Sequence, residues 1–415
     1  MKSNKGSIKD SQYVITGIGI TSAVGQGKAD FFSAISQGLH NFDIMRRPGR
    51  QYETDDAVSE FLGAEIDELK VPEEIHNSTL RTASLSARVG LVTIHEAWHD
   101  AELDGMDSER VGLVVGGSNY QQRESFVLQN HYKDRPNFLR PTYGLTFMDS
   151  DIVGLCTDYF GIKGLSHTIG GASASGQLAI IQGIHLLESG QLDVCIVLGA
   201  LMDLSFWECQ GFKALGAMGS DQYANQPDKA CRPFDQGHDG FIYGENCGAL
   251  VIERSGEREK SAYAMVEGFG STMDANRNAN PSIEGEAGAI AKALNMASVG
   301  AGDVDYVNPH GTGSPLGDAV ELSALRACGL EHVMINTTKS IIGHGLSAAG
   351  IVEVIATVLQ MDGGILHPSR NLTNPIEENW NWVRQSGIAH RINRAITMSM
   401  GFGGINTALC IRNIY

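Results

Sequence analysis

The hydrophobic positions of the chain fall into short apolar runs that alternate with segments of helical spacing. Residues 13–20 and 111–117 are apolar runs that lead into glycine turns, and 192–201 is a third such run, as expected of buried strands. Residues 174–189 carry apolar side chains at helical spacing, and Gly190 ends the predicted helix. Strands that alternate with helices predict an α/β fold with largely buried sheets. Further apolar segments predict a strand pair over 241–253, a strand over 304–307 and a helix over 351–359.

The second half of the chain repeats features of the first. A charged stretch, 253–260, precedes a strand whose glycine spacing matches that of the first strand, and two small-residue segments each open an apolar helix. Two echoes in the same order predict an internal duplication. We therefore expect a flexible tail over 1–12, one half over 13–255 and a second over 256–415. The matching residues are Gly17, Gly19 and Thr21 with Gly268, Gly270 and Thr272, and 173–176 with 347–350.

Composition narrows the classes of function. The chain has 31 Lys+Arg and 48 Asp+Glu, a formal net charge of −17, which gives it no overall electrostatic reason to bind nucleic acid. Hydrophobic residues make up 42% of the 415 residues, enough for a sizeable core. The seven cysteines form no Cys-x-x-Cys pair and favour reduced, buried thiols in a cytoplasmic protein. We find no signal peptide and no membrane-spanning apolar run.

The segment 170–176, Gly-Gly-Ala-Ser-Ala-Ser-Gly, is a candidate catalytic turn. Its small residues permit a sharp strand-to-helix turn, and Ser173 would lie near free backbone N–H groups at the start of the helix. Such a turn can expose a nucleophile and supply an oxyanion donor. The pattern misses the esterase Gly-x-Ser-x-Gly motif only at its last position. The alternative interpretation is an ordinary serine N-cap.

Three later segments carry candidate chemistry in glycine-rich loops, where a rigid scaffold can hold functional side chains. His310 follows the predicted strand 304–307 and precedes Thr312, Ser314 and Asp318. Each segment alone also fits an ordinary structural role. Lys339 and His344 flank a turn in 336–350, and Phe402 stands between glycines in 398–406.

No segment has the spacing of a metal site, and no phosphate-binding loop is complete. The residues Gly17 and Gly19 follow a strand, but Ser22 interrupts the dinucleotide pattern. We therefore expect neither a metal nor a nucleotide cofactor.

Taken in order, these segments resemble the β-ketoacyl-carrier-protein synthase family, the condensing enzymes of fatty-acid and polyketide synthesis. The resemblance covers about 400 residues and implies the α/β thiolase fold, with two βαβαβαββ halves in an αβαβα layering, usually as a homodimer. It also implies an acidic acyl carrier protein that presents its substrate on phosphopantetheine. The motifs are Val14-Ile-Thr-Gly-Ile-Gly, the signature 232–241, His310-Gly-Thr, Lys339-Ser-Ile-Ile-Gly-His and Gly401-Phe-Gly-Gly.

One residue departs from the family pattern. Family members carry a nucleophilic cysteine where this chain has Ser173. A cysteine thiolate is accessible near neutral pH, whereas a serine hydroxyl needs an adjacent base, so acyl loading and condensation should be impaired. His310 and His344 match the two family histidines that assist loss of CO₂ from a malonyl thioester. The resemblance therefore implies a malonyl-carrier-protein decarboxylase, similar to the Ser-type enzymes of β-branching in polyketide biosynthesis.

The resemblance also assigns supporting roles. Lys339, Glu353 and Phe402 would support the catalytic group of Ser173, His310 and His344, while Thr312 and Ser314 would bind the pantetheine arm. Two other functions stay open: a non-catalytic subunit similar to a chain-length factor, and an acyltransferase or hydrolase that uses Ser173 as its nucleophile. For carrier-protein docking we expect a local basic patch made of Arg46, Arg47 and Arg50.

Overall fold

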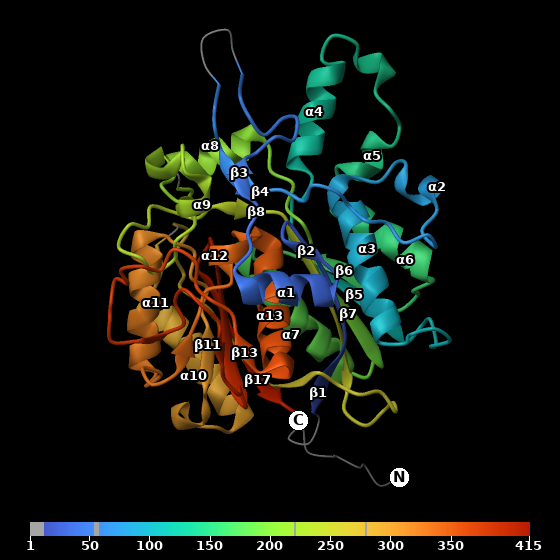
Figure 1. Cartoon of the computed structure of the whole chain (residues 1–415). Helices are drawn as coiled ribbons and strands as arrows, with labels where there is room; N and C mark the ends of the chain where they lie inside the picture. Colours follow the sequence, from blue (N-terminus) through green and yellow to red (C-terminus); the bar gives the residue numbers. More distant parts are fainter. Residues whose placement is uncertain (1–11, 54–57, 220, 279) are drawn as a thin grey trace, which may run out of the picture.

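The computed structural model describes residues 12–53, 58–219, 221–278 and 280–415. A sheet of twelve strands runs through this described part (Figure 1). Nearly all of the predicted flexible tail, residues 1–11, lies outside the described residues. In order across the sheet, the strands are β14 (Asn381–Trp382), β12 (Met334–Ile335), β11 (Tyr306–Asn308), β16 (Arg394–Gly401), β17 (Ile405–Asn413), β10 (Ala264–Met273), β1 (Tyr13–Ser22), β9 (Asn246–Arg254), β7 (Val194–Gly199), β5 (Val111–Gly116) and β6 (Ser166–Ile169), with β2 (Gly25–Gln26) beside β1.

The helices form layers on both sides of the sheet and between its halves. Two small sheets lie outside it, β13 (Ile365–Leu366) with β15 (Ile388–Ala389), and β3 (Phe42–Ile44) with β4 (Leu62–Ala64) and β8 (Tyr243–Gly244). The helices are α1 (Lys28–Gln37), α2 (Asn77–Leu80), α3 (Leu85–Asp100), α4 (Gln122–Tyr132), α5 (Tyr143–Thr146), α6 (Ser150–Phe160), α7 (Ser175–Glu188), α8 (Phe206–Ala214), α9 (Pro227–Ala230), α10 (Ile283–Ala297), α11 (Pro315–Ala327), α12 (Lys339–Ile342) and α13 (Ala349–Gly363), with short 3₁₀ turns η2 (Pro136–Phe138), η3 (Ala172–Ala174), η4 (Asp221–Tyr223), η5 (Ala301–Asp303) and η6 (Leu346–Ala348).

The sheet consists of two halves with the same strand order, joined by antiparallel pairing of β1 with β10. From this centre outward, the strands run β1-β9-β7-β5-β6 in one half and β10-β17-β16-β11-β12 in the other. Each half follows the order βαβαβαββ along the chain, through α3, α6 and α7 or through α10, α11 and α13. This is the thiolase-type duplication expected from the sequence.

The repeated glycines have a packing reason. A Cβ on Gly19 would lie 2.0 Å from the backbone oxygen of Thr93 in α3, and a Cβ on Gly270 would lie 2.0 Å from that of Ala289 in α10. Both distances are far inside van der Waals contact, so only glycine lets each helix lie this close to its strand. Each strand also shifts register at the corresponding point, before Gly17 and before Gly268. The matching glycines in the two halves therefore reflect the same close contact between a helix and a strand.

The layering is helix, sheet, helix, sheet, helix. Helix α7 packs on β5 and β7, helix α13 packs on β9 and β16, and the two helices touch in the middle layer (Figure 1). Helices α3 and α6 cover one outer face, and α10 covers the other with α11 packed against it. The segment Leu346–Gly363 has a mean hydropathy of 1.3 and meets the length and composition of a membrane span, but 89% of it is buried within the protein. It is the central core helix.

The predicted elements exist, with shifted ends. The helix over 174–189 is α7, Ser175–Glu188, and the helix over 351–359 begins two residues earlier as α13. The strand pair predicted over 241–253 is wrong, because β8 and β9 do not pair with each other. Strand β8 pairs with β4, whereas β9 lies between β1 and β7.

Candidate active site

Ser173 lies on a strained turn between β6 and α7. The preceding residue, Ala172, has φ +49°, a left-handed conformation that costs a non-glycine residue on the order of 1–3 kcal/mol. The Ser175 hydroxyl holds this turn, since it accepts from the Gly171 N–H at 2.8 Å and donates to the Ala172 carbonyl at 2.6 Å. Ser173 is thereby held at the start of α7 with 9% of its surface exposed.

The loop after β16 lies directly against this turn. A Cβ on Gly401 would lie 2.2 Å from the Gly171 carbonyl oxygen, so the absence of a side chain lets the two backbones meet. The next residue, Phe402, is 41% exposed and lines the same cavity as Ser173. Its ring lies 6.1 Å from that of Phe212, and Gly403 and Gly404 turn the chain back into β17. Ser173 and Phe402 thus share one wall of the cavity.

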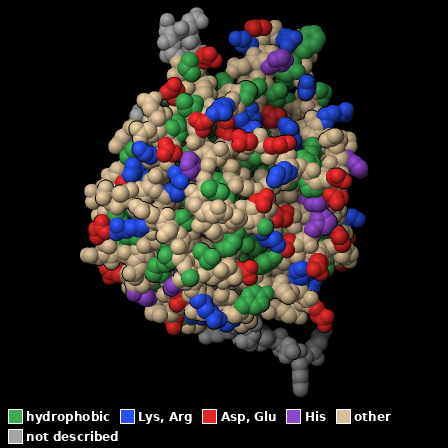
Figure 2. All heavy atoms as spheres, in the orientation of Figure 1, with side chains coloured by type: hydrophobic (Ala, Val, Ile, Leu, Met, Phe, Trp, Pro, Cys, Tyr) green, Lys and Arg blue, Asp and Glu red, His purple; other side chains and the backbone are tan. Residues whose placement is uncertain are grey.

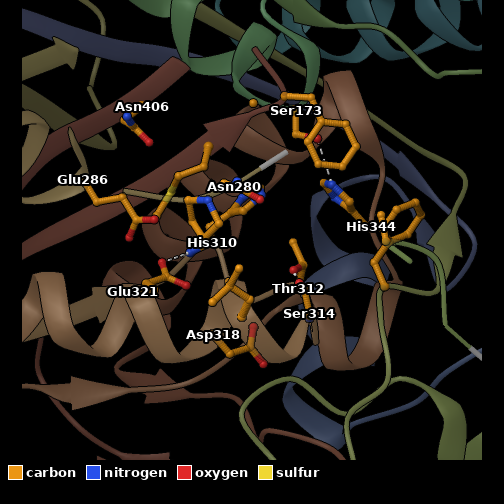
Figure 3. A pocket seen from close by; sticks show the side chains of 18 of the residues that line it. Ser173, Asn280, Glu286, His310, Thr312, Ser314, Asp318, Glu321, His344 and Asn406 are labelled. Atoms are coloured by element: carbon orange, nitrogen blue, oxygen red, sulfur yellow. Dashed lines mark hydrogen bonds between the residues drawn. The ribbon is translucent and has the colours of Figure 1, made fainter. Parts of the chain in front are cut away.

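His310 and His344 meet beside Ser173. Their ring centroids lie 5.3 Å apart at an interplanar angle of 85°. The Nε2 atom of His344 lies 2.9 Å from the Ser173 Oγ atom, within hydrogen-bond distance (Figure 3). The backbone N–H of His344 donates to the Ile242 carbonyl at 2.7 Å, which fixes the loop after α12. The structure therefore brings the three predicted catalytic residues together.

A buried lysine lies behind the histidines. The Lys339 ammonium forms an ion pair with Glu353 and donates to the His310 carbonyl oxygen. Its Nζ atom is also 3.4 Å from the His310 Nδ1 atom. Because an ammonium group only donates, Nδ1 must accept, and the proton of a neutral His310 resides on Nε2. His310 also lines the cavity.

Burial keeps both imidazoles neutral near pH 7. Desolvation is the largest cause that lowers the pKa of His310 well below 6.5, followed by the positive charge of Lys339 and by His344. Desolvation and Lys339 lower the pKa of His344 in the same way. Burial raises the pKa of Glu353 to about 7, although Lys339 opposes that rise. Neutral imidazoles can donate one hydrogen bond each without carrying a buried charge.

Two carboxylates on α11 hold the loop that carries His310. Glu321 accepts the backbone N–H groups of His310 and, at 2.8 Å, of Gly311. Asp318 accepts the N–H of Gly313 at 3.1 Å and lies 2.8 Å from the His238 Nδ1 atom of the motif 232–241. Sequence reasoning noted Asp318 but missed Glu321. The spacing of three residues on one helix face was the available signal.

These residues line a cavity of about 240 Å³. Thr312 and Ser314 lie on its wall, together with His310 and Glu321 (Figure 3). None of the seven cysteines lines it, and six of them are buried elsewhere. The cavity is also lined by several polar residues that were not predicted as site residues from the sequence. These are Asp274, Asn278, Asn280, Glu286 and Asn406.

The predicted docking patch is wrong for two of its three arginines. Arg50 is fully buried and forms ion pairs with Glu65, Asp203 and Glu245. Arg47 forms a two-pronged ion pair with Glu245 at 2.6 and 2.8 Å. Arg46 is exposed and pairs with an acidic neighbour in the same loop. The cluster is dense in sequence because it holds this loop against the core, so it is not a free basic surface.

The fold and this site define a condensing-enzyme scaffold. The family model for the β-ketoacyl synthase N-terminal domain matches residues 11–258, and that for the C-terminal domain matches 263–373. The chain belongs to the β-ketoacyl synthase family.

Individual relatives cover nearly the whole chain. It is 57% identical to the polyketide biosynthesis malonyl-ACP decarboxylase PksF of Bacillus subtilis, over 97% of each chain. It is 30% identical to 3-oxoacyl-[acyl-carrier-protein] synthase 1 of Buchnera aphidicola, over 96% of this chain and 98% of that one. A crystal structure of a β-ketoacyl synthase from Burkholderia phymatum has a TM-score of 0.87 at 24% identity and covers 98% of this chain and 100% of that one.

Proposed function

We propose that this protein is an enzyme of polyketide biosynthesis that removes CO₂ from malonyl-acyl carrier protein and leaves acetyl-acyl carrier protein. The observation that carries the proposal is a site with two neutral imidazoles and a serine hydroxyl where condensing enzymes carry a thiol. The 57% identity to a relative named malonyl-ACP decarboxylase supports it.

The geometry suits the charge that develops during decarboxylation. When the bond between Cα and the carboxylate breaks, the electron pair moves onto the thioester and the oxygen becomes an enolate. The proposed donors to this oxygen are the Nε2–H of His310 and an N–H of His344, whose Nε2 atom lies beside Ser173 at the cavity wall. The backbone amides of Ser173 and Phe402 are further candidates. One well-placed donor of this kind stabilises a transition state by about 3 kcal/mol. No step needs a covalent enzyme intermediate.

We propose that the substrate arrives on the phosphopantetheine arm of a carrier protein and that the enzyme uses no cofactor or metal of its own. Thr312 and Ser314 are proposed to bind the amides of this arm, because both line the cavity, both are partly exposed, and a hydroxyl can donate or accept. A structural relative of 24% identity and TM-score 0.83 is a type II ketosynthase in complex with its acyl-carrier protein, which supports an acyl carrier protein as partner.

We propose a homodimer in the cytoplasm. Strand β6 ends the large sheet, and within the described residues it pairs only with β5, so its outer edge is open for a second copy. Leu165, directly before this strand, is 47% exposed. Sedimentation equilibrium tests the dimer: a monomer at micromolar concentration would contradict it.

A second candidate function, that of an acyltransferase or hydrolase with Ser173 as its nucleophile, is favoured by the contact between Ser173 and His344. A neutral imidazole 2.9 Å from a serine hydroxyl can act as a general base, as in acyltransferases and hydrolases.

One assay separates these functions. The purified protein is incubated with malonyl-carrier protein, and both proteins are weighed intact by mass spectrometry. A carrier that loses one CO₂ supports the decarboxylase, and an acylated enzyme or free malonate supports a serine nucleophile. An unchanged carrier contradicts both and supports a non-catalytic subunit. Methylmalonyl-carrier protein in a parallel reaction establishes the substrate preference.

A further inference from the structure

Glu286 is a buried carboxyl group in the cavity that no step above uses. It lies in the first turns of α10, is 2% exposed, and lines the cavity together with Ser173, His310 and His344. Its Oε2 atom has no hydrogen-bond partner among the described residues. Figure 3 shows the side chains of Glu286, Glu321 and His310 converging on one side of the cavity, with Ser173 and His344 on the other. A buried carboxyl group without a hydrogen-bond partner lowers the stability of the folded protein. Its presence in the cavity therefore suggests that it acts on a bound molecule.

The neighbours of Glu286 favour its protonated form. Burial is the largest cause that raises its pKa well above 4.5, and the charges of Glu321 and Asp274 raise it further. The start of α10 opposes this rise, but a helix end contributes only about 0.3–1 kcal/mol. His310, the other titratable neighbour on this wall, is neutral near pH 7. Among the described residues, the charges that act on Glu286 are those of Glu321 and Asp274, and neither can stabilise a Glu286 anion.

Of the two carboxyl groups Glu286 and Glu321, we expect Glu286 to be the one that holds a proton near neutral pH. Burial raises the pKa of Glu321 to about 8, but both of its oxygens accept backbone N–H groups, which stabilise its anion. Glu286 has no such donor. Because the negative charge of Glu321 raises the pKa of Glu286, the two carboxyl groups do not both ionise readily, and one keeps a proton near neutral pH.

A decarboxylase must protonate carbon. In a condensing enzyme the enolate carbon attacks an acyl group held on cysteine, whereas here Ser173 replaces that cysteine. We propose that the Glu286 carboxyl group supplies the proton that converts the enolate into the acetyl methyl group. This inference rests on the proposed decarboxylation. The Cα–carboxylate bond breaks to release CO₂, the enolate carbon forms a C–H bond with the Glu286 proton, and the Glu286 carboxylate regains a proton from solvent through the mouth of the cavity.

The test is Glu286→Gln, which keeps the shape of the side chain but removes the acidic proton. Loss of a general acid lowers kcat by about 10²–10⁴, and we expect KM to change little. Wild-type kcat should fall as pH rises through the ionisation of the donor, and the variant should lose this high-pH fall. Glu284→Gln is the matched control, because Glu284 is exposed in the same helix turn and should leave both quantities unchanged.

The outcomes separate this inference from the proposed function. If wild-type protein releases no CO₂ from malonyl-carrier protein, the decarboxylase proposal fails. If wild-type protein is active but Glu286→Gln keeps its kcat and pH profile, only the proton-donor role fails. A rise in KM alone would mean that Glu286 binds the malonyl carboxylate instead, and would also overturn the proposal. If the variant does not fold, as judged by its thermal unfolding, a wild-type pH profile without a high-pH fall overturns it.

Discussion

Replacing Ser173 by alanine distinguishes a positioning serine from a nucleophile. The structure gives the Ser173 hydroxyl one side-chain hydrogen bond, the 2.9 Å contact with His344. Such a bond contributes about 1 kcal/mol, which corresponds to about a fivefold change in rate. We therefore expect Ser173→Ala to retain most of its turnover. His310→Ala and His344→Ala each remove a donor aimed at the enolate oxygen and should lose about 10²–10³ in kcat.

The assay is formation of acetyl-carrier protein, followed by intact mass after rapid quenching. Thermal unfolding of each variant checks its fold. The matched control is Ser347→Ala. Ser347 occupies the corresponding turn of the second half, is buried, and donates to the Ala200 carbonyl at 2.9 Å outside the cavity. The Ser347→Ala variant should have a lower free energy of unfolding and an unchanged turnover. A Ser173→Ala protein without activity, beside histidine variants of near-native rate, would refute the reasoning and establish a covalent serine mechanism.

Three further outcomes are expected. Ser173→Cys should accept an acyl chain from an acyl-carrier thioester, seen as a mass adduct; a folded variant that stays unmodified would show that the acyl pocket is lost. Turnover should stay constant as pH falls below 6.5, because the depressed pKa values of His310 and His344 keep both rings neutral there; a loss of rate near pH 6.5 would contradict this. Unfolding restores ordinary histidine pKa values, so the unfolded chain binds more protons below pH 6.5 and stability should decline as pH falls. Arg50→Met should lower stability by about 3–5 kcal/mol, because it removes the fully buried cation that pairs with Glu65, Asp203 and Glu245 and, among the described residues, leaves Glu245 with Arg47 alone and Asp203 with Arg123 alone; denaturant unfolding measures this, and a change within error would contradict the structural role.

The site residues that could be predicted from the sequence lie where the shape of the backbone restricts which residue types fit. Ser173, His310, His344 and Phe402 stand among small residues or glycines because their loops turn sharply or touch another backbone, and those patterns are visible without a structure. The paired echoes of Gly19 and Gly270 likewise follow from helix-on-strand contacts.

The site predictions that were wrong or missing have a common physical cause. The direction of a side chain in an irregular loop depends on the tertiary fold. Arg46 and Arg50 are four residues apart, yet one is exposed and the other buried among carboxylates. Glu286 and Glu321 sit in ordinary helices, where glutamate is a common surface residue. Only the packing of α10 and α11 against the cavity makes them buried groups beside His310.

The duplication allows the turn that carries Ser173 to be compared with its counterpart in the second half. Ala172 and Leu346 share a left-handed conformation, with φ +49° and +52°, and each precedes a serine and then a central helix. Both turns therefore have a strained residue directly before their serine, and both place that serine near the start of a central helix. The difference is what faces the hydroxyl: Ser173 meets the His344 imidazole at a cavity wall, whereas Ser347 donates to a backbone carbonyl in the core. The surroundings of the Ser173 hydroxyl thus depend on the loop that carries His344, because the turn alone does not supply them.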